Sequence, residues 1–518
     1  MVIWPTKKRL YTYMCGICAA LCMFINGYDA AVFNNLQGLD SFMLYMGLDK
    51  DAPKDQNMIG AVTSSYLAAS IASGITVSPL ISHYLGRRAT IFAGCLLVAV
   101  ASIVQTFSTN IGAFIAGRVI LGIGQGIALP AGPVFMSEIC SPEVRGRMLS
   151  FWQMMYSVGA LVTSFTAYGC KLNEGLGLWQ WKTVTLLQAA IPVICCATIF
   201  TCPESPRWLI SKGKFDQAKR ALERTREEDQ VVEEFEGIKA SIEWEKENSS
   251  NSLKELWVDK SIRRRMILGL IMNFGQQLTG QSMMTSYSTK VYQKIFNDDA
   301  TVLLINALNF TFGILFTLTC TFFSDKLGRT KMLIGCAFGQ AAMLLIAATV
   351  YLGTPTLPDG AKSFAIGVAL VLVLFLFTFF YKPGWGATTW IYTSEIFPMR
   401  VRGTAVAICT NTQSVGGLVM GQAFPSMFTT MGFYSFYVWM GVNLLLVVLI
   451  FLFYPETKGV PLEEMDRLFS QPLGRSFGLC GRRPKKSLEH SVDTFEEKQI
   501  QHTENTDEEA VVKTVGKV

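Results

Sequence analysis

Two charged residues interrupt stretches that are otherwise apolar. Asp29 lies within Gly27-Tyr28-Asp29 in the apolar run 10–33, and Lys382 lies in the run 363–392. A charge at the centre of a bilayer costs roughly 2.5–3.5 kcal/mol on insertion scales, so such residues usually face a cavity or a partner. A carboxylate whose burial and neighbouring charges change could alternately capture and release a proton. Asp29 is therefore the candidate group for proton transfer.

The position of Lys382 can be estimated from helix geometry. It lies 13 residues before Glu395, at the predicted cytoplasmic end, and this is about 20 Å of α-helix. The ammonium group is therefore predicted near the middle of the membrane, facing a cavity or an acidic partner. Trp390 follows eight residues later, roughly two helical turns, so both side chains could line one face. A lysine that is neutralised by burial or held in a structural ion pair is the alternative.

The elements that carry these residues are predicted to be membrane helices. Half of the 518 residues are hydrophobic, only 16% are charged, and the mean hydropathy is +0.34. Soluble domains rarely have this composition, and the apolar spans that follow exclude a soluble enzyme. Apolar runs of about 20 residues, enough to cross a hydrocarbon core, recur near 10–33, 57–82, 90–108, 111–136, 150–169, 183–202, 265–290, 300–323, 332–352, 363–392, 402–429 and 434–454. We predict an all-α membrane protein with about twelve transmembrane helices in two six-helix bundles.

The distribution of basic residues predicts the orientation in the membrane. Loops on one side carry most of the cations, namely Lys7, Lys8, Arg9, Arg87, Arg88, Arg145, Arg147, Lys326, Arg329, Lys331, Arg400 and Arg402. Cationic loops stay cytoplasmic, so both termini are predicted in the cytoplasm. The first run contains Asp29 and lacks a small-residue cleavage site, which favours a retained helix over a signal peptide. The formal charge of +6 is explained by these loops and implies no nucleic-acid partner.

The thirteen cysteines lie mainly inside apolar runs. Cys15 and Cys18 form a Cys-x-x-Cys pattern, but only within the first run. We therefore expect packed free thiols and neither a zinc site nor a disulfide framework. No metal and no cofactor are expected.

Changes in composition divide the chain into four parts. We predict an N-terminal six-helix bundle over 1–202, a cytoplasmic helical linker over 203–262, a C-terminal six-helix bundle over 263–466 and a disordered cytoplasmic tail over 467–518. The linker places apolar residues at helical spacing. The tail is polar and partly acidic.

Charged motifs repeat between the two halves. Glu138 and Arg145 recur as Glu395 and Arg402, each 257 positions later. The full set of predicted gating residues is Arg87, Glu138, Arg145, Glu204, Arg329, Glu395, Arg402 and Glu456. Such arginines and acids could pair to hold the bundles together when the cavity opens outward, and opening inward would break the pairs. Topology signals and helix caps are the alternative for each residue alone.

Several of these motifs together resemble the sugar porter family of the major facilitator superfamily. They are PESPRWL at 203–209, Gly117-Arg118 with Gly122, Gly124 and Gly126, Pro133 to Gly146, Gln276 to Gly280, Gly384-Trp385-Gly386 and PETKG at 455–459. The resemblance covers residues 10–466 and is closest to fungal-type, proton-coupled members. It implies transport by alternating access without covalent chemistry. The glycines after Arg118 are expected to allow close helix packing.

The resemblance also implies roles for individual residues. Asp29 matches the proton-coupling aspartate, and Arg118 matches the arginine that pairs with it. A static buried ion pair is the alternative. The family's sugar-binding positions map onto Gln153, Gln276, Gln277, Trp390 and Gln413. Amides can bind hydroxyl groups and an indole can stack on a sugar ring, although interhelical packing would also explain each residue alone.

Departures from the family pattern concern the substrate. Ser282 replaces an asparagine, Ser286 precedes Tyr287 in place of a tyrosine pair, and Gly313 occupies the approximate register of another asparagine. A cation at Lys382 that replaces lost hydroxyl contacts suits a substrate carboxylate. We therefore expect a symporter for a monosaccharide or a sugar acid, with galacturonate favoured.

Two other functions remain open at this point. They are a neutral hexose or pentose symporter, in which Lys382 is held in an ion pair, and a sugar-sensing receptor with the same fold. The expected partners are the sugar, the proton and the lipid bilayer, and the expected form is a monomer in the plasma membrane.

Overall fold

The computed structural model describes residues 7–49, 52–140, 142–248, 256–357, 362–397, 399–458 and Phe469. These residues form helices joined by short turns and contain no strand. The all-α prediction is therefore confirmed. The predicted tail over 467–518 lies outside the described residues, apart from Phe469.

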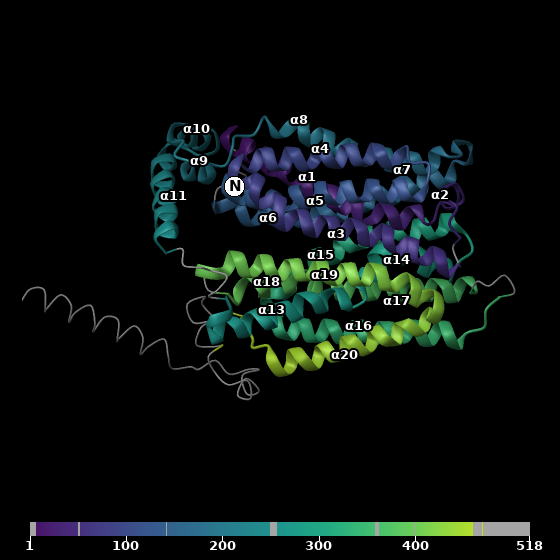
Figure 1. The fold of residues 1–518 in the computed structure, drawn as a ribbon. Helices are drawn as coiled ribbons and strands as arrows, with labels where there is room; N and C mark the ends of the chain where they lie inside the picture. Colours follow the sequence, from purple (N-terminus) through teal and green to yellow (C-terminus); the bar gives the residue numbers. More distant parts are fainter. Residues whose placement is uncertain are drawn as a thin grey trace, which may run out of the picture.

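Long helices run side by side in the two halves, and the linker helices stand at one end (Figure 1). The first half comprises α1 Lys7–Leu36, α2 Asp40–Met46, α3 Pro53–Tyr84, α4 Arg87–Thr106, α5 Ile111–Ile139, α6 Pro142–Leu172, η1 Glu174–Leu176, α7 Trp179–Leu187 and α8 Ala190–Ile199. The linker contains α9 Pro206–Ser211, α10 Phe215–Thr225 and α11 Glu228–Asn248. We call the end of the bundles beside these three helices the linker end, and the opposite end the far end.

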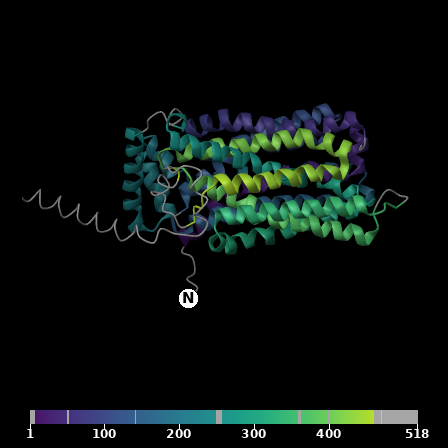
Figure 2. The ribbon, with the colours of Figure 1, turned by 90° about the horizontal axis from the view of Figure 1, so that it is seen from below.

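The long helices of the second half also run side by side, as the view from below shows (Figure 2). Its elements are α13 Lys260–Leu278, α14 Gln281–Gln293, α15 Asp299–Leu327, α16 Arg329–Gly353, α17 Phe364–Tyr381, η2 Lys382–Thr388, α18 Thr389–Glu395, α19 Met399–Met431, η3 Gly432–Tyr434 and α20 Ser435–Phe453.

Nine stretches of the described chain are long and apolar enough to cross a membrane. One of them, Thr404–Phe453, includes both α19 and α20. The helix α6 and the consecutive pair α13 and α14 are not among the nine, but they also run along the bundles. Adding α6 and the α13–α14 pair to the nine stretches, and counting α19 and α20 separately, gives twelve spans. This number agrees with the prediction from the sequence.

Glycines of α5 allow its close approach to α3 and α4. A Cβ atom added at Gly126 would lie 2.2 Å from the carbonyl oxygen of Ser70, and one at Gly122 would lie 2.3 Å from that of Tyr66. At Gly124 it would lie 2.8 Å from the carbonyl oxygen of Gly94. These distances are too short for any side chain, so the predicted packing role of these glycines is confirmed.

A small cluster of Ala31, Ala160 and Phe310 joins the two bundles, and a larger apolar core is continuous across them at the far end. One cluster of buried side chains there joins residues of the first half, such as Phe33 and Leu36, to residues of the second, such as Val291 and Leu303. Toward the linker end, the first half has its own cluster around Phe135 and the second half has another. The bundles are therefore packed together at the far end.

Candidate functional site

Asp29 is fully buried, and two amide groups hold its carboxylate. Gln125 of α5 donates through Nε2 to Oδ2 at 2.8 Å, and Gln188, at the junction of α7 and α8, donates through Nε2 to Oδ1 at 2.5 Å. Both carboxylate oxygens are therefore hydrogen-bonded to neutral donors from other helices. This arrangement stabilises the charged form of a carboxyl group in an apolar bundle.

Arg118 lies beside Asp29, but its contact differs from the predicted ion pair. Its Nη1 donates to the backbone carbonyl of Asp29 at 3.3 Å. The guanidinium carbon lies 5.3 Å from the centre of the Phe33 ring and 5.7 Å from that of Tyr66. The described contacts of Arg118 thus include no hydrogen bond to the carboxylate itself, because the two glutamines occupy both oxygens and aromatic faces hold the cation. The part of Arg118 in proton coupling stays a prediction.

Lys382 begins the π-helix η2, near the middle of the continuous span Phe364–Glu395. Its side chain is partly buried and extends over Gly313 of α15: a Cβ atom added at Gly313 would lie 3.4 Å from Lys382 Cε and 3.9 Å from Nζ. Within the described part of the chain, the ammonium group forms no ion pair and no hydrogen bond. The missing side chain at Gly313 therefore leaves room for a cation without a protein partner.

The π-helix alters the relation between Lys382 and Trp390. Over Lys382–Thr388 the hydrogen bonds connect residues five apart, so eight residues no longer correspond to two α-helical turns. Pro383 has no N–H group, and the Thr388 hydroxyl donates to its carbonyl oxygen at 2.9 Å. The α-helical spacing behind the expected shared face therefore does not apply here, and the shared face stays a prediction. Trp390 is 41% exposed on α18.

The predicted sugar-binding glutamines have different surroundings. Gln276 is buried, and its Nε2 donates to the carbonyl oxygen of Trp385 at 2.7 Å, so it ties α13 to η2. Gln277 accepts a hydrogen bond from Ser282, at 2.9 Å, where the family has an asparagine. Gln153 is exposed on α6, and the buried Oε1 of Gln413 on α19 has no hydrogen-bond partner. The structure brings Gln277 close to α19, but it places Gln153 on the other bundle.

Polar contacts at the far end join the two bundles. Asn34 of α1 donates through Nδ2 to Ser288 Oγ at 2.9 Å and accepts from the backbone N–H of Thr289 at 3.1 Å. Lys171 at the end of α6 lies 2.8 Å from Asp40 and 3.7 Å from Asp299 of the second half. These contacts and the shared apolar core hold the far end closed.

Two ion pairs at the linker end each lie within a single bundle. Arg87 pairs with Glu138 at 3.0 Å, and Arg329 pairs with Glu395 at 3.0 Å. The expectation that these pairs join the two bundles is therefore wrong for Arg87 and Arg329, because each acid lies within reach on a neighbouring helix of its own half. The side chains of Arg145 and Arg402 lie outside the described residues.

The remaining predicted gating acids bind backbone groups. Glu204 accepts from the N–H groups of Arg87 and Arg88, at 3.1 and 3.2 Å. Burial raises the pKa of the Glu204 carboxyl, and these hydrogen bonds oppose the shift. Glu456 accepts from the N–H of Arg329 at 2.8 Å in the second half. Both acids therefore cap helix N-termini, the alternative that the sequence left open.

Buried thiols gather inside the first bundle. The sulfur atoms of Cys22, Cys95 and Cys195 lie within 4.8 Å of one another. None of the eleven cysteines whose side chains the structure describes forms a disulfide. His83 contacts Lys212 of the linker, with 3.2 Å between Nε2 and Nζ.

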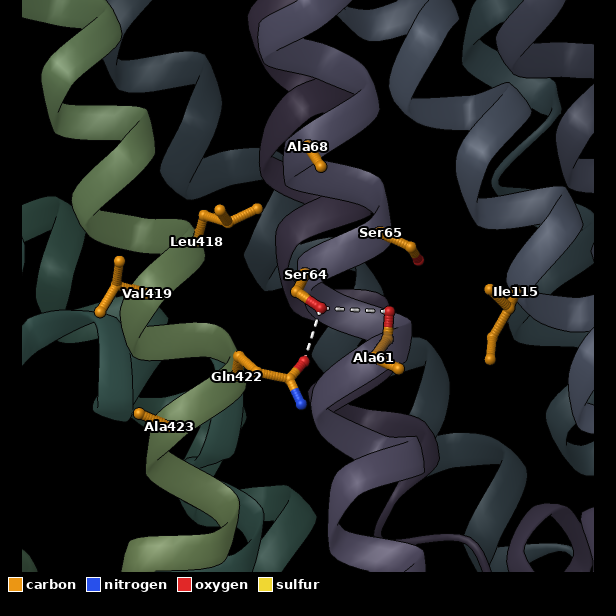
Figure 3. A pocket seen from close by; sticks show the side chains of 9 residues that line it. All are labelled: Ala61, Ser64, Ser65, Ala68, Ile115, Leu418, Val419, Gln422 and Ala423. Carbon is orange, nitrogen blue, oxygen red and sulfur yellow. Dashed lines mark hydrogen bonds between the residues drawn. The ribbon is translucent and has the colours of Figure 1, made fainter.

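A groove of about 630 Å³ lies between α3, α5 and α19 (Figure 3). Ser64 and Gln422 both line it, and the Ser64 hydroxyl donates to Oε1 of Gln422 at 2.8 Å. Its lining is mostly apolar and includes none of the predicted substrate residues.

Gln125 and Gln188, the hydrogen-bond partners of Asp29, were not singled out from the sequence. Both are amides inside apolar runs, which is a weak signal because Gln105 and Gln340 are also buried in spans. Only the fold places two of these amides on the two oxygens of Asp29.

Comparison with known proteins identifies the family. The profile of the family "Sugar (and other) transporter" matches residues 15–469. A probable quinate permease of Aspergillus niger is 29% identical over 497 residues, with 91% of each chain covered. Sugar transport protein MST3 of Oryza sativa subsp. japonica is 30% identical over 488 residues, covering 89% of this chain and 91% of the relative.

Solved structures show the same fold. The inward open conformation of the xylose transporter XylE from E. coli superposes with a TM-score of 0.72 at 23% identity, covering 88% of this chain and 99% of that chain. A crystal structure of a D-xylose-proton symporter gives a TM-score of 0.68 at 22% identity, with 87% and 99% covered. The chain is therefore a multi-pass membrane transporter, not an enzyme, and belongs to the sugar transporter family.

Proposed function

We propose that the protein is a proton-coupled symporter that imports a monosaccharide or sugar acid, with a galacturonate-like uronic acid as the favoured substrate. The observation that carries this proposal is Lys382. Its ammonium group lies near the middle of a membrane span, beside the space left by Gly313, and forms no ion pair within the described part of the chain. An unpaired cation at this depth is costly, and a substrate carboxylate would offset that cost.

The curated relatives fit a substrate of this chemistry. Quinate, named for several fungal relatives, is a ring that carries hydroxyl groups and a carboxylate. Galacturonate also combines a ring, hydroxyl groups and a carboxylate. The names of the sugar transport proteins among the relatives mention no acid. Gln277, Gln413, Trp390 and Gln153 would bind the hydroxyl groups and the ring. Gln276 acts differently in this proposal, because it fixes the π-helix that carries Lys382.

Asp29 would carry the proton. It is fully buried, and its hydrogen-bond partners come from two other helices, so a movement of these helices changes its surroundings. A monoanion carried with one proton is electroneutral, and with two protons it moves one positive charge inward. The membrane potential assists only the second case.

The linker end would face the cytoplasm, because the basic residues Arg87, Arg88, Arg329 and Lys331 lie there. With this orientation in the plasma membrane, closure of the far end corresponds to an inward-facing state of a transporter that acts as a monomer. The contacts of Asn34 and Lys171 would then form the external gate. In the outward-facing state, Arg145 and Arg402 would contact the opposite bundle.

The test is uptake by transporter-deficient yeast that expresses this chain. Radiolabelled galacturonate, quinate and glucose are compared with and without a protonophore. Galacturonate uptake that the protonophore abolishes supports the proposal. Glucose uptake alone would contradict the sugar-acid assignment, and sugar-dependent signalling without any uptake would indicate a receptor.

A further inference from the structure

The surroundings of Asp29 contain a feature that an Asp–Arg pair does not explain. Gln125 and Gln188 donate to the two carboxylate oxygens, at 2.8 and 2.5 Å, and both side chains are almost completely buried. They come from different parts of the first bundle, α5 and the junction of α7 and α8. The carboxylate is shielded from bulk solvent, and the two amides solvate it.

The amide of Gln188 has an unused group. Its Oε1 is buried and has no hydrogen-bond partner. A carboxylate only accepts hydrogen bonds, whereas a protonated carboxyl must also donate one. Rotation of the Gln188 amide by half a turn would exchange its N–H for the oxygen and provide this acceptor without any movement of the backbone.

We propose that Gln125 and Gln188 are positioning residues that set the proton affinity of Asp29, and that Gln188 reverses its amide when Asp29 is protonated. Gln125 donates to Oδ2 of Asp29 whether the carboxyl group is charged or protonated. Gln188 donates through Nε2 to the charged carboxylate and accepts through Oε1 from the protonated carboxyl group. This inference rests on the proposed proton coupling, and it assigns part of that coupling to two uncharged side chains.

Other ionisable groups that face Asp29 come from three helices. They are Tyr28 of α1, Tyr66 of α3 and Arg118 of α5. The Tyr28 hydroxyl donates to the carbonyl oxygen of Val184, and the Tyr66 hydroxyl donates to Asn26. None of these hydrogen bonds involves Gln125 or Gln188, so replacing a glutamine leaves the bonds of Tyr28 and Tyr66 in place.

The test is the pH dependence of proton-driven uptake for Gln188→Leu and Gln125→Leu in the full-length protein. Loss of a hydrogen bond to the charged carboxylate makes protonation easier, so the alkaline limb of the profile should move up by about one pH unit for each variant. Exchange of labelled for unlabelled substrate at equal concentrations needs no net proton release. The pH profile of this exchange should therefore shift less than the profile of proton-driven uptake. Gln180→Leu is the matched control. Gln180 of α7 is also a buried glutamine, but its Nε2 donates to the nearby Asn173 carbonyl oxygen and not to Asp29.

Gln188→Glu guards against a folding defect, because it has nearly the same shape. A second carboxyl group beside Asp29 should also move the limb to higher pH. Profiles for Gln188→Leu and Gln188→Glu that overlay the wild type would overturn the inference. Wild-type uptake that responds neither to pH nor to a protonophore would instead refute the proton coupling itself, so the two failures are distinguishable.

Discussion

Asn34 offers the sharpest test of the external gate. Its side chain is fully buried and makes two hydrogen bonds to the other bundle, to Ser288 Oγ and to the Thr289 N–H. The next residue, Asn35, is equally buried, but it donates to Ser164 Oγ at 3.0 Å inside its own bundle. Replacing each by alanine therefore separates contacts between the bundles from contacts within one.

The expected size of the effect follows from these contacts. A buried hydrogen bond contributes about 0.5–1.5 kcal/mol, and a buried partner left unsatisfied costs about 1–3 kcal/mol. Asn34→Ala should therefore destabilise the closed far end by about 2–3 kcal/mol. Since 1.4 kcal/mol is a factor of ten, the ratio of closed to open molecules should fall about 30- to 100-fold. Asn35→Ala should weaken the first bundle equally in both states.

The assay is a distance measurement across the far end by pulsed EPR in lipid nanodiscs. Spin labels are attached through ketone-bearing amino acids at Leu44, which is 80% exposed, and Tyr434, which is 58% exposed. This chemistry leaves the native cysteines untouched. Asn34→Ala should add a population with longer distances. Identical distributions for Asn34→Ala and Asn35→Ala would refute the role of Asn34 in the gate.

Two further predictions follow from the packing. Gly126→Ala should lower the unfolding temperature of the purified protein by several degrees, because a Cβ atom there would lie 2.2 Å from the Ser70 carbonyl oxygen and overpacking costs about 1–3 kcal/mol. The helical Gly335 has no neighbouring atom within 4 Å of an added Cβ, so Gly335→Ala should not destabilise; equal losses in the two variants would contradict this account. Gln276→Leu should reduce substrate affinity about tenfold by releasing η2, which Gln276 holds at the Trp385 carbonyl. Equilibrium binding measures this change, and unchanged affinity would show that the π-helix needs no such anchor.

The membrane architecture could be predicted from the sequence because bilayer thickness fixes the length of an apolar helix. The packing role of Gly122, Gly124 and Gly126 was also predictable, since glycines inside an apolar span have few other uses. The two-bundle arrangement followed from the repeated motifs around Glu138 and Glu395. These features depend on local composition and on spacing along a helix.

The details of the site were less predictable because they depend on the three-dimensional packing. Regular α-helical spacing failed between Lys382 and Trp390, where Pro383 and two glycines lie in a π-helix. The partners of Asp29 are uncharged amides, and an amide in an apolar run has no distinctive pattern. The pairing of Arg87 with Glu138 depends on which helix lies beside α4. The sequence also does not specify which end of the bundles is closed.

The most direct test of the central claim is the affinity of the purified protein for galacturonate and for galactose, its neutral counterpart, before and after Lys382→Met. Methionine is unbranched and only one atom shorter than lysine, so it keeps most of the side chain but removes the charge. A hydrogen bond to a charged group contributes about 1.5–3 kcal/mol, so galacturonate binding should weaken about 10- to 100-fold while galactose binding stays nearly the same. Equal effects on the two ligands, or none, would contradict recognition of a substrate carboxylate by Lys382.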